Sequence, residues 1–241
     1  SQALKDAVKW GIILHNPAAV VTPPRSERKE AVAWDSVAIK QFMDAAGGSR
    51  YRDAYSLAAL TGMRRSELAG LKWPDIDLKS ARLRVVRTRQ RIYGHGVVEG
   101  QPKTHRSRRS VALSPSAVSV LESMKTKQIE MRLKAGPAWQ QTDYVFTMDN
   151  GVPIDPDNLS HEFHRIVDEA ELPNGTLHGL RHSFATALLS ANVHPAVVQS
   201  ALGHSSITLT IDTYSHVMPG LEEAAARSID DVLGDAVAGN S

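Results

Sequence analysis

The chain has 241 residues, of which 42% are hydrophobic, and it carries a net charge of only +2 and no cysteine. This composition excludes a disulfide framework and a thiolate metal site, and no apolar run approaches the roughly 20 residues that span a bilayer. No charged-then-apolar leader opens the sequence. We therefore expect a cytoplasmic protein with one large domain or two small ones.

The beginning of the chain predicts two helices joined by a linker. Apolar residues at helical spacing favour a helix over residues 3–14. Proline and charge are concentrated in residues 21–34, which we interpret as the linker. A further helix is expected over residues 35–46. We accordingly divide the chain into residues 1–20 and a larger domain over residues 35–241.

Two short helices are expected next. Residues 51–61 and 66–71 are apolar at helical spacing and meet around Gly62, so Arg64 lies at a tight junction between them. Glu67 follows Arg64 by three residues and can orient its guanidinium group. An ordinary surface arginine remains the alternative for Arg64.

A small antiparallel sheet is expected between these helices and the next long helix. Its strands are predicted in residues 81–88, 97–98 and 111–113. The stretch from Lys79 to Arg109 holds ten basic residues and a single acid, Glu99. Such a local excess of positive charge is typical of a surface that binds a polyanion, and a solvated strand face is the alternative. The candidate DNA-binding residues in this stretch are Arg87, Arg106 and Arg108.

The rest of the chain is predicted to be mostly helical. An amphipathic helix is expected over residues 114–135, with Leu121, Met124, Ile129 and Met131 or Leu133 on its buried side. A short strand is expected at residues 144–146. Further helices are expected over residues 157–171, 178–190, 194–202 and 221–233. The predicted fold is therefore mainly α with a small antiparallel β-sheet, in the α+β class.

One segment, His178-Gly179-Leu180-Arg181-His182, combines imidazole and guanidinium groups on one predicted helix. His178 and His182 have the spacing of a zinc pair, but the glutamate of a His-Glu-x-x-His motif and a third ligand are missing, so we expect no metal. His178 and Arg181 lie three residues apart and can both donate to one phosphate oxygen. A capping histidine beside a surface arginine remains the alternative.

His204 and Tyr214 lie ten residues apart in a polar, threonine-rich stretch. A tyrosine among hydroxyl and imidazole groups is suited to act as a nucleophile beside cations that bind a phosphate. Taken alone, such a histidine is more often structural and such a tyrosine more often half-buried. We interpret Tyr214 as the group that attacks a DNA phosphodiester, in a pocket built by the upstream basic residues.

Five motifs occur in a specific order along the chain. They are Thr61-Gly62-Met63-Arg64-Arg65-Ser66-Glu67-Leu68, Pro102-Lys103-Thr104, His178-Gly179-Leu180-Arg181-His182, Leu202-Gly203-His204-Ser205-Ser206 and Thr213-Tyr214-Ser215-His216. Together they resemble the signature boxes of the tyrosine recombinases, the phage integrase family, and the likeness runs from about residue 3 to residue 218. Box by box, the family's catalytic positions fall on Arg64, Lys103, His178, Arg181, His204 and Tyr214.

The resemblance implies DNA cleavage through a covalent 3′-phosphotyrosine, with no ATP, metal or other cofactor. Three donors would hold the non-bridging oxygens, where other nucleases use a metal ion: Arg64, Arg181 and His204. His178 would take the proton of Tyr214, and Lys103 would protonate the departing 5′ oxygen. Alanine at either arginine or at the lysine is expected to slow cleavage and to leave the fold intact.

The implied function is that of a site-specific recombinase or integrase of a phage or mobile element. It would act on double-stranded DNA in the bacterial nucleoid, as a homotetramer on paired sites. Chromosome-dimer resolution, a type IB topoisomerase and a catalytically silent DNA-binding protein remain alternatives. Family members carry a helical core-binding domain in front, and residues 1–20 would be its last helix, so we expect a fragment. The helix over 221–233 would pack on another subunit or on its own domain.

Overall fold

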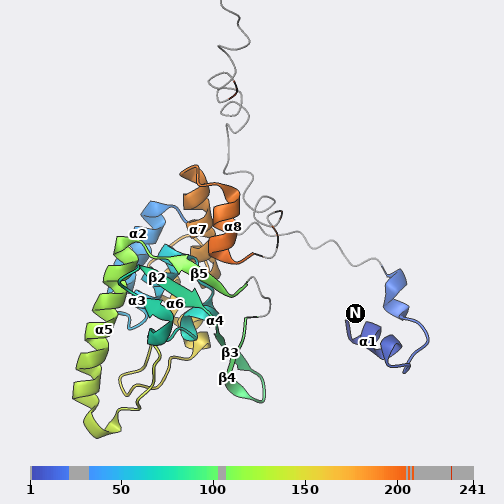
Figure 1. Ribbon diagram of the computed structural model, residues 1–241, viewed down its shortest axis with the longest axis horizontal. Helices are drawn as coiled ribbons and strands as arrows, with labels where there is room; N and C mark the ends of the chain where they lie inside the picture. Colours follow the sequence, from blue (N-terminus) through green and yellow to red (C-terminus); the bar gives the residue numbers. More distant parts are fainter. Residues whose placement is uncertain are drawn as a thin grey trace, which may run out of the picture. The chain divides into compact units, whose positions relative to one another are not determined.

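The computed structural model describes residues 2–21, 33–102, 107–204, 206, 208 and 229. It divides the chain into two compact units, Ser1–Ala31 and Val32–Ser241 (Figure 1). Most of the predicted linker over 21–34 lies outside the described residues. The boundary placed between residues 1–20 and 35–241 therefore stays a prediction.

Residues 2–21, the described part of the first unit, contain one short helix and one 3-10 turn. Helix α1 spans Gln2–Lys9, and the turn η1 spans Pro17–Val20. The helix predicted over residues 3–14 is therefore wrong in its last part. The reason lies at Gly11, whose left-handed φ of +72° ends the helical hydrogen bonding.

The second unit begins with three helices that match the predicted ones. They are α2 (Ser36–Ala45), α3 (Arg52–Thr61) and α4 (Arg65–Ala69). The side chain of Asp35 caps α2 by accepting a hydrogen bond from the backbone N of Ala38 at 2.8 Å. Between α3 and α4, Gly62 has a φ of +63°, and a Cβ at this position would lie 2.6 Å from the ring of Phe184. The junction that precedes Arg64 therefore requires glycine.

The predicted antiparallel pairing is confirmed, but the strands form two sheets. Strands β1 (Ile76–Asp77), β2 (Arg82–Val85) and β5 (Arg109–Ala112) make one sheet in the order β1-β2-β5, and β3 (Thr88–Ile92) pairs with β4 (Gly96–Gly100) in a separate hairpin (Figure 1). Leu83 and Val85 of β2 are buried in the core, whereas β3 has no buried residue. The chain leaves the first sheet after Val85, and the β3–β4 hairpin that follows is a separate sheet with a more exposed first strand.

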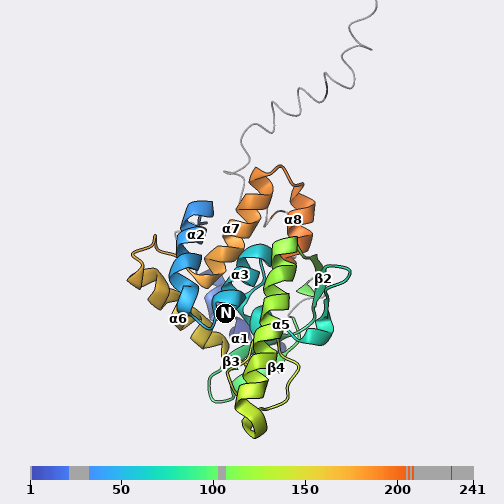
Figure 2. The same cartoon turned by 90° about the vertical axis from the view of Figure 1, so that its left-hand side faces the viewer.

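Four further helices follow in the described part of the second unit, as predicted. They are α5 (Pro115–Ala135), α6 (Pro156–Glu169), α7 (Leu177–Ser190) and α8 (Pro195–Leu202). Helix α3 packs against both α5 and α7 (Figure 2). Three buried rings from different helices meet in the core, where the centroids of Phe42 and Phe163 are 4.5 Å apart and Tyr55 meets both edge-on. Leu68 of α4 and Leu180 of α7 belong to the same core, so the helices that carry the predicted site residues pack on it.

The second half of α5 extends beyond this core (Figure 2). Leu121 and Met124 are buried as predicted, but Ile129 is 55% exposed and Leu133 is 78% exposed. The expectation that Ile129 lies on the buried side is therefore wrong. Periodicity indicates which face of a helix is apolar, but it does not show how far neighbouring elements cover that face.

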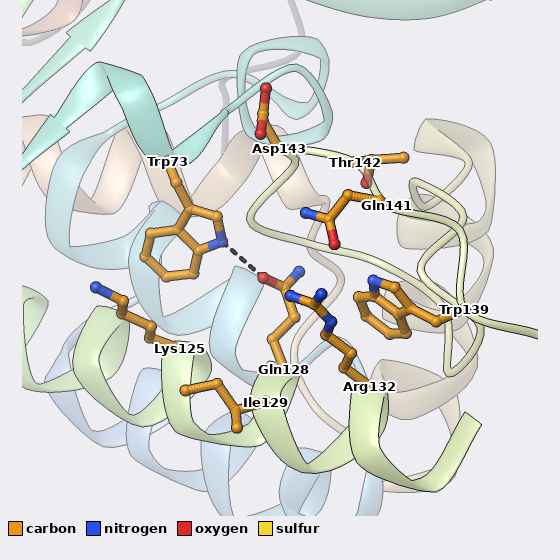
Figure 3. Close-up of a pocket in the computed structure, with 9 residues that line it drawn as sticks. All are labelled: Trp73, Lys125, Gln128, Ile129, Arg132, Trp139, Gln141, Thr142 and Asp143. Atoms are coloured by element: carbon orange, nitrogen blue, oxygen red, sulfur yellow. Dashed lines mark hydrogen bonds between the residues drawn. The ribbon is translucent and has the colours of Figure 1, made fainter. Parts of the chain in front are cut away.

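The segment after α5 returns along the side of this helix (Figure 3). The indole of Trp73 donates a hydrogen bond to Gln128 of α5 at 2.7 Å, and a hollow opens between these residues and Trp139. None of the predicted site residues that the structure describes lines this hollow. The strand predicted over 144–146 is present only as an isolated bridge between Lys72 and Tyr144.

The helix predicted over 221–233 lies outside the described residues, apart from Ile229. Within the described ranges, no helix combines the length and the apolar character that a membrane crossing needs.

Candidate active site

Arg64 stands directly before the first turn of α4, at the junction that Gly62 creates. Its Nη1 donates to Glu67 Oε1 at 2.8 Å, and its backbone N donates to Glu67 Oε2 at 2.9 Å. The carboxylate therefore orients the guanidinium group, as the three-residue spacing predicts. The Arg64 side chain remains 33% exposed, so its charge can meet a ligand at the surface.

Arg181 of α7 is buried, with only 2% of its surface exposed. Its Nη1 donates to the carbonyl oxygen of Gly62 and its Nη2 to that of Leu202, each at 2.7 Å. One side chain thus joins the α3–α4 junction to the end of α8. Because Arg181 binds two backbone carbonyls in the interior, these bonds argue against the prediction that alanine at this position leaves the fold intact.

Three histidines accompany these arginines. His178 and His182 lie one turn apart on α7, with ring centroids 4.9 Å apart in an edge-to-face arrangement. His204 directly follows Gly203, which ends α8 with a left-handed φ of +65°. His204 therefore leaves the helix at the end that Arg181 also contacts.

Removal from water and neighbouring positive charges lower the pKa of these three imidazoles, so they are neutral at pH 7. Removal from water, followed by the charges of His182, Arg181 and Arg64, lowers the pKa of His178 to about 4. Removal from water and the neighbouring arginines also lower the pKa of His204 to about 4. Because His178 is itself exposed, the neighbouring positive charges contribute to its neutrality together with its partial removal from water. A neutral imidazole can accept a proton from a nucleophile.

These lowered pKa values predict a loss of stability in acid. In the folded protein the pKa of His204 lies near 4, below its ordinary value of 6.5, so the unfolded chain binds more protons between these values. The stability present at neutral pH is therefore lost as the pH falls from about 7 toward 4. We expect the melting temperature, measured by circular dichroism, to decrease less from pH 7 to pH 5 in His204→Gln than in the wild-type protein. His161→Gln, at an exposed position on α6, is the control, and equal losses in all three proteins would contradict the prediction.

Arg64 and His178 line one open hollow on the surface of the domain. Its remaining lining residues come from α4, β3, α6 and the start of α7: Arg65, Ser66, Gln90, Ser160, His164, Thr176 and Leu177. Arg65 is already paired with Asp157 of α6 at 3.0 Å. Sequence reasoning did not identify the α6 residues, because nothing local connects them with the boxes around Arg64 and His178. The hollow is the candidate binding site for a ligand held by these two residues.

The basic stretch between Lys79 and Arg109 is less positive than its sequence indicates. Acidic side chains from other elements pair with three of its arginines: Arg87 binds Asp75, Arg91 binds Asp155, and Arg109 binds Glu67. Arg108 lies exposed beside Gln101. Of the candidate DNA contacts, Arg108 is thus accessible and Arg87 is engaged in an ion pair.

Three predicted site residues, Lys103, Arg106 and Tyr214, lie outside the described residues. The structure brings Arg64, Arg181, His178 and His204 to one region and leaves the positions of the other three as predictions. In the part of the chain that the structure describes, no group of three or more His, Asp or Glu side chains is arranged to hold a metal ion. Independence from metal is likewise still a prediction.

Comparison with known proteins identifies relatives over nearly the whole chain. The model of the phage integrase family matches residues 35–220. A tyrosine recombinase XerC-like protein of Caldanaerobacter subterraneus subsp. tengcongensis is 33% identical, over 94% of this chain and 62% of that protein. The ICEBs1 integrase of Bacillus subtilis is 28% identical, over 97% of this chain and 63% of that protein. The chain thus spans less than two thirds of the length of these relatives.

Solved structures share the fold. The integrase of the Tn1549 transposon, in complex with a circular intermediate DNA, has a TM-score of 0.76 and 22% identity, over 95% of this chain and 76% of that one. A lambda integrase dimer bound to a COC′ core site has a TM-score of 0.60 and 20% identity, over 88% of this chain and 56% of that one. These likenesses confirm the predicted fold, mainly α with small antiparallel sheets.

Proposed function

Because the chain belongs to the phage integrase family, we propose that it is the catalytic part of a site-specific tyrosine recombinase. The observation that supports this most is the convergence of four predicted catalytic residues from three segments of the chain: Arg64, His178, Arg181 and His204. A partly exposed arginine, a buried arginine and neutral imidazoles in one region suit a negatively charged phosphodiester. Residues 35–241 form the catalytic domain in this proposal, and residues 1–20 the end of a core-binding domain.

The proposed reaction is an in-line displacement at a DNA phosphate. The phenolic oxygen of Tyr214 attacks phosphorus while His178, neutral at pH 7, takes the phenolic proton. The bond from phosphorus to the 5′ oxygen breaks, and Lys103 gives that oxygen a proton. The extra negative charge of the transition state is stabilised by three donors: Arg64, Arg181 and His204.

The product of this step is a 3′-phosphotyrosine and a free 5′ hydroxyl. The phosphodiester is exchanged for another ester of similar energy, so the step needs neither ATP nor a metal ion. Attack by a 5′ hydroxyl from a second duplex reverses the step and joins the exchanged strands. Such an exchange requires two paired double-stranded sites, so a homotetramer on DNA is part of the proposal.

Two biological settings suit this chemistry. We favour a phage or mobile element, because relatives and structural neighbours include the ICEBs1 integrase and the Tn1549 transposon integrase. Chromosome-dimer resolution is the second candidate, because the XerC-like protein is 33% identical. Recombination of a site taken from the flanks of the coding region would support the first setting. Recombination of a site near the replication terminus would support the second.

The test of the proposed function is the capture of a covalent adduct. Labelled DNA carrying the flanking site and a nick beside the cleavage position is incubated with the protein, so that the short strand diffuses away after cleavage. Denaturing electrophoresis should show label that migrates with the protein, in the presence of EDTA as well. No adduct on any such substrate would contradict the proposal. Relaxation of plasmid DNA without site preference would favour a type IB topoisomerase.

The accessible part of the basic stretch is expected to bind the DNA backbone. Arg108→Ala should weaken binding at every sequence and reduce the slope of log affinity against log salt by about 0.9, the value for one phosphate contact. Arg87→Ala should change the slope less, because Arg87 is paired with the buried Asp75. Fluorescence anisotropy over a salt series measures both slopes. A wild-type slope in Arg108→Ala would rule out this contact.

A further inference from the structure

Glu67 is a buried carboxylate shared by two arginines. It is 2% exposed and accepts four hydrogen bonds. Two come from the backbone N and Nη1 of Arg64, at 2.9 and 2.8 Å, and two from Nη1 and Nη2 of Arg109, at 3.0 and 2.9 Å. Although burial raises the pKa of Glu67, the bonds and charge of Arg109 hold it below its ordinary value. The group is therefore a carboxylate at neutral pH.

Arg109 is fixed independently of Arg64. It opens strand β5, and its side chain is 5% exposed. Its Nε donates to the carbonyl oxygen of Ala201 in the last turn of α8, at 2.6 Å. A cation at this position also interacts favourably with the carbonyl end of the helix. The guanidinium is thus held between the end of α8 and both oxygens of Glu67.

This arrangement controls the freedom of Arg64. An arginine bound to a single carboxylate at the surface is held weakly, because both side chains can rotate. Here Glu67 is held on its buried side by the two parallel bonds of Arg109, so it offers Arg64 a fixed acceptor. We propose that Arg109 is a positioning residue, which acts on the DNA phosphate only through Glu67 and Arg64. The proposal rests on the function proposed above for Arg64.

The role proposed for Arg109 separates it from the other basic residues between Lys79 and Arg109. Arg109 is the last of its ten basic residues, and its sequence position would place it among the DNA contacts. We assign it no phosphate contact, because its charge is paired with the Glu67 carboxylate and its Nε and both Nη atoms already donate to Glu67, Ala201 and Ser107. Substitution of Arg109 should therefore affect the cleavage step and leave the salt dependence of DNA binding unchanged.

Arg109→Lys is the informative variant. It keeps a positive charge beside Glu67, so the fold is retained, but it loses the planar fork that makes two parallel bonds. Methionine would leave the buried carboxylate without this partner and is less suitable. We expect the rate of adduct formation on nicked DNA to fall about 10- to 100-fold, as for a small misplacement of a reacting group. DNA affinity should change less than about threefold, because no phosphate contact is lost.

Arg165→Lys is the matched control. Arg165 also binds two carboxylates, those of Glu162 and Glu169, but it lies exposed on α6 and lines no part of the site. Its rate should equal that of wild type. In the background of Arg64→Ala, the Arg109→Lys change should slow cleavage by less than about threefold, since no guanidinium remains to be positioned. Additive losses in the double variant would show a merely structural role and overturn the proposal.

A second measurement needs no DNA cleavage. In protein labelled with ¹⁵N-arginine, the Nε–H signal of Arg64 is assigned by its absence in Arg64→Lys. We expect its heteronuclear NOE to fall in Arg109→Lys and to stay at the wild-type value in Arg165→Lys. An unchanged NOE in Arg109→Lys would overturn the proposal. If wild-type protein forms no adduct, the proposed function fails, while this NMR experiment still decides whether Arg109 positions Arg64.

Discussion

Tyr214→Phe is expected to bind site DNA with wild-type affinity and to form no covalent adduct. The substitution removes only the phenolic hydroxyl, so the ring and its packing are kept while the nucleophile is lost. The adduct of the wild-type protein should be attached through a 3′ phosphate and should form in EDTA, because Arg64, Arg181 and His204 replace a metal ion in the proposed reaction. Denaturing electrophoresis of labelled nicked DNA measures the adduct, and a gel-shift assay measures the affinity.

A matched control tests whether the loss of adduct is specific to the hydroxyl group of Tyr214. Tyr93 is fully exposed at the tip of the β3–β4 hairpin, and Tyr93→Phe should form adduct at the wild-type rate. A covalent band that persists in Tyr214→Phe would show that another residue is the nucleophile. A wild-type band that requires magnesium would instead contradict the metal-free mechanism.

Arg64→Ala and Arg181→Ala are expected to have similar effects on cleavage and different effects on stability. Each variant loses one donor to the transition state, which lowers the rate by about two to three orders of magnitude. Arg64→Ala leaves Glu67 paired with Arg109, so we expect a stability loss of only about 1 kcal/mol. Arg181→Ala removes a buried side chain and leaves the carbonyls of Gly62 and Leu202 unpaired, which costs about 2–5 kcal/mol.

Urea denaturation and single-turnover cleavage measure the two quantities separately. Arg50→Ala, which removes an exposed arginine paired with Asp149, should match wild type in both. Equal stabilities of Arg64→Ala and Arg181→Ala would contradict the structural role of Arg181. A wild-type cleavage rate in Arg64→Ala would show that Arg64 does not act in catalysis. It would also contradict the proposal that Arg109 and Glu67 position Arg64 for cleavage.

The sequence alone predicted those parts of the protein that depend on neighbours in the chain. The α5, α6, α7 and α8 helices follow from the spacing of their apolar residues. The contact of Glu67 with Arg64 follows from a three-residue spacing on one helix. The order of the five motifs identified the family, and the match over residues 35–220 confirms it. In each case the information lies within one or two helical turns or in the order of short segments.

The tertiary structure decided which charges meet across the fold. Arg109 reaches a carboxylate 42 positions earlier and a carbonyl 92 positions later, and Arg91 reaches Asp155 across 64 positions. From the sequence, both arginines belong to one positively charged stretch. In the packed structure Arg109 is buried, and Arg91 pairs with Asp155 at the start of α6. The sequence likewise suggests that Arg181 donates hydrogen bonds at the surface. In the structure it is buried and connects the end of α3 at Gly62 with the end of α8 at Leu202. Local spacing limits which neighbours a side chain can touch, but only the packed core determines which distant groups face it and how much water remains.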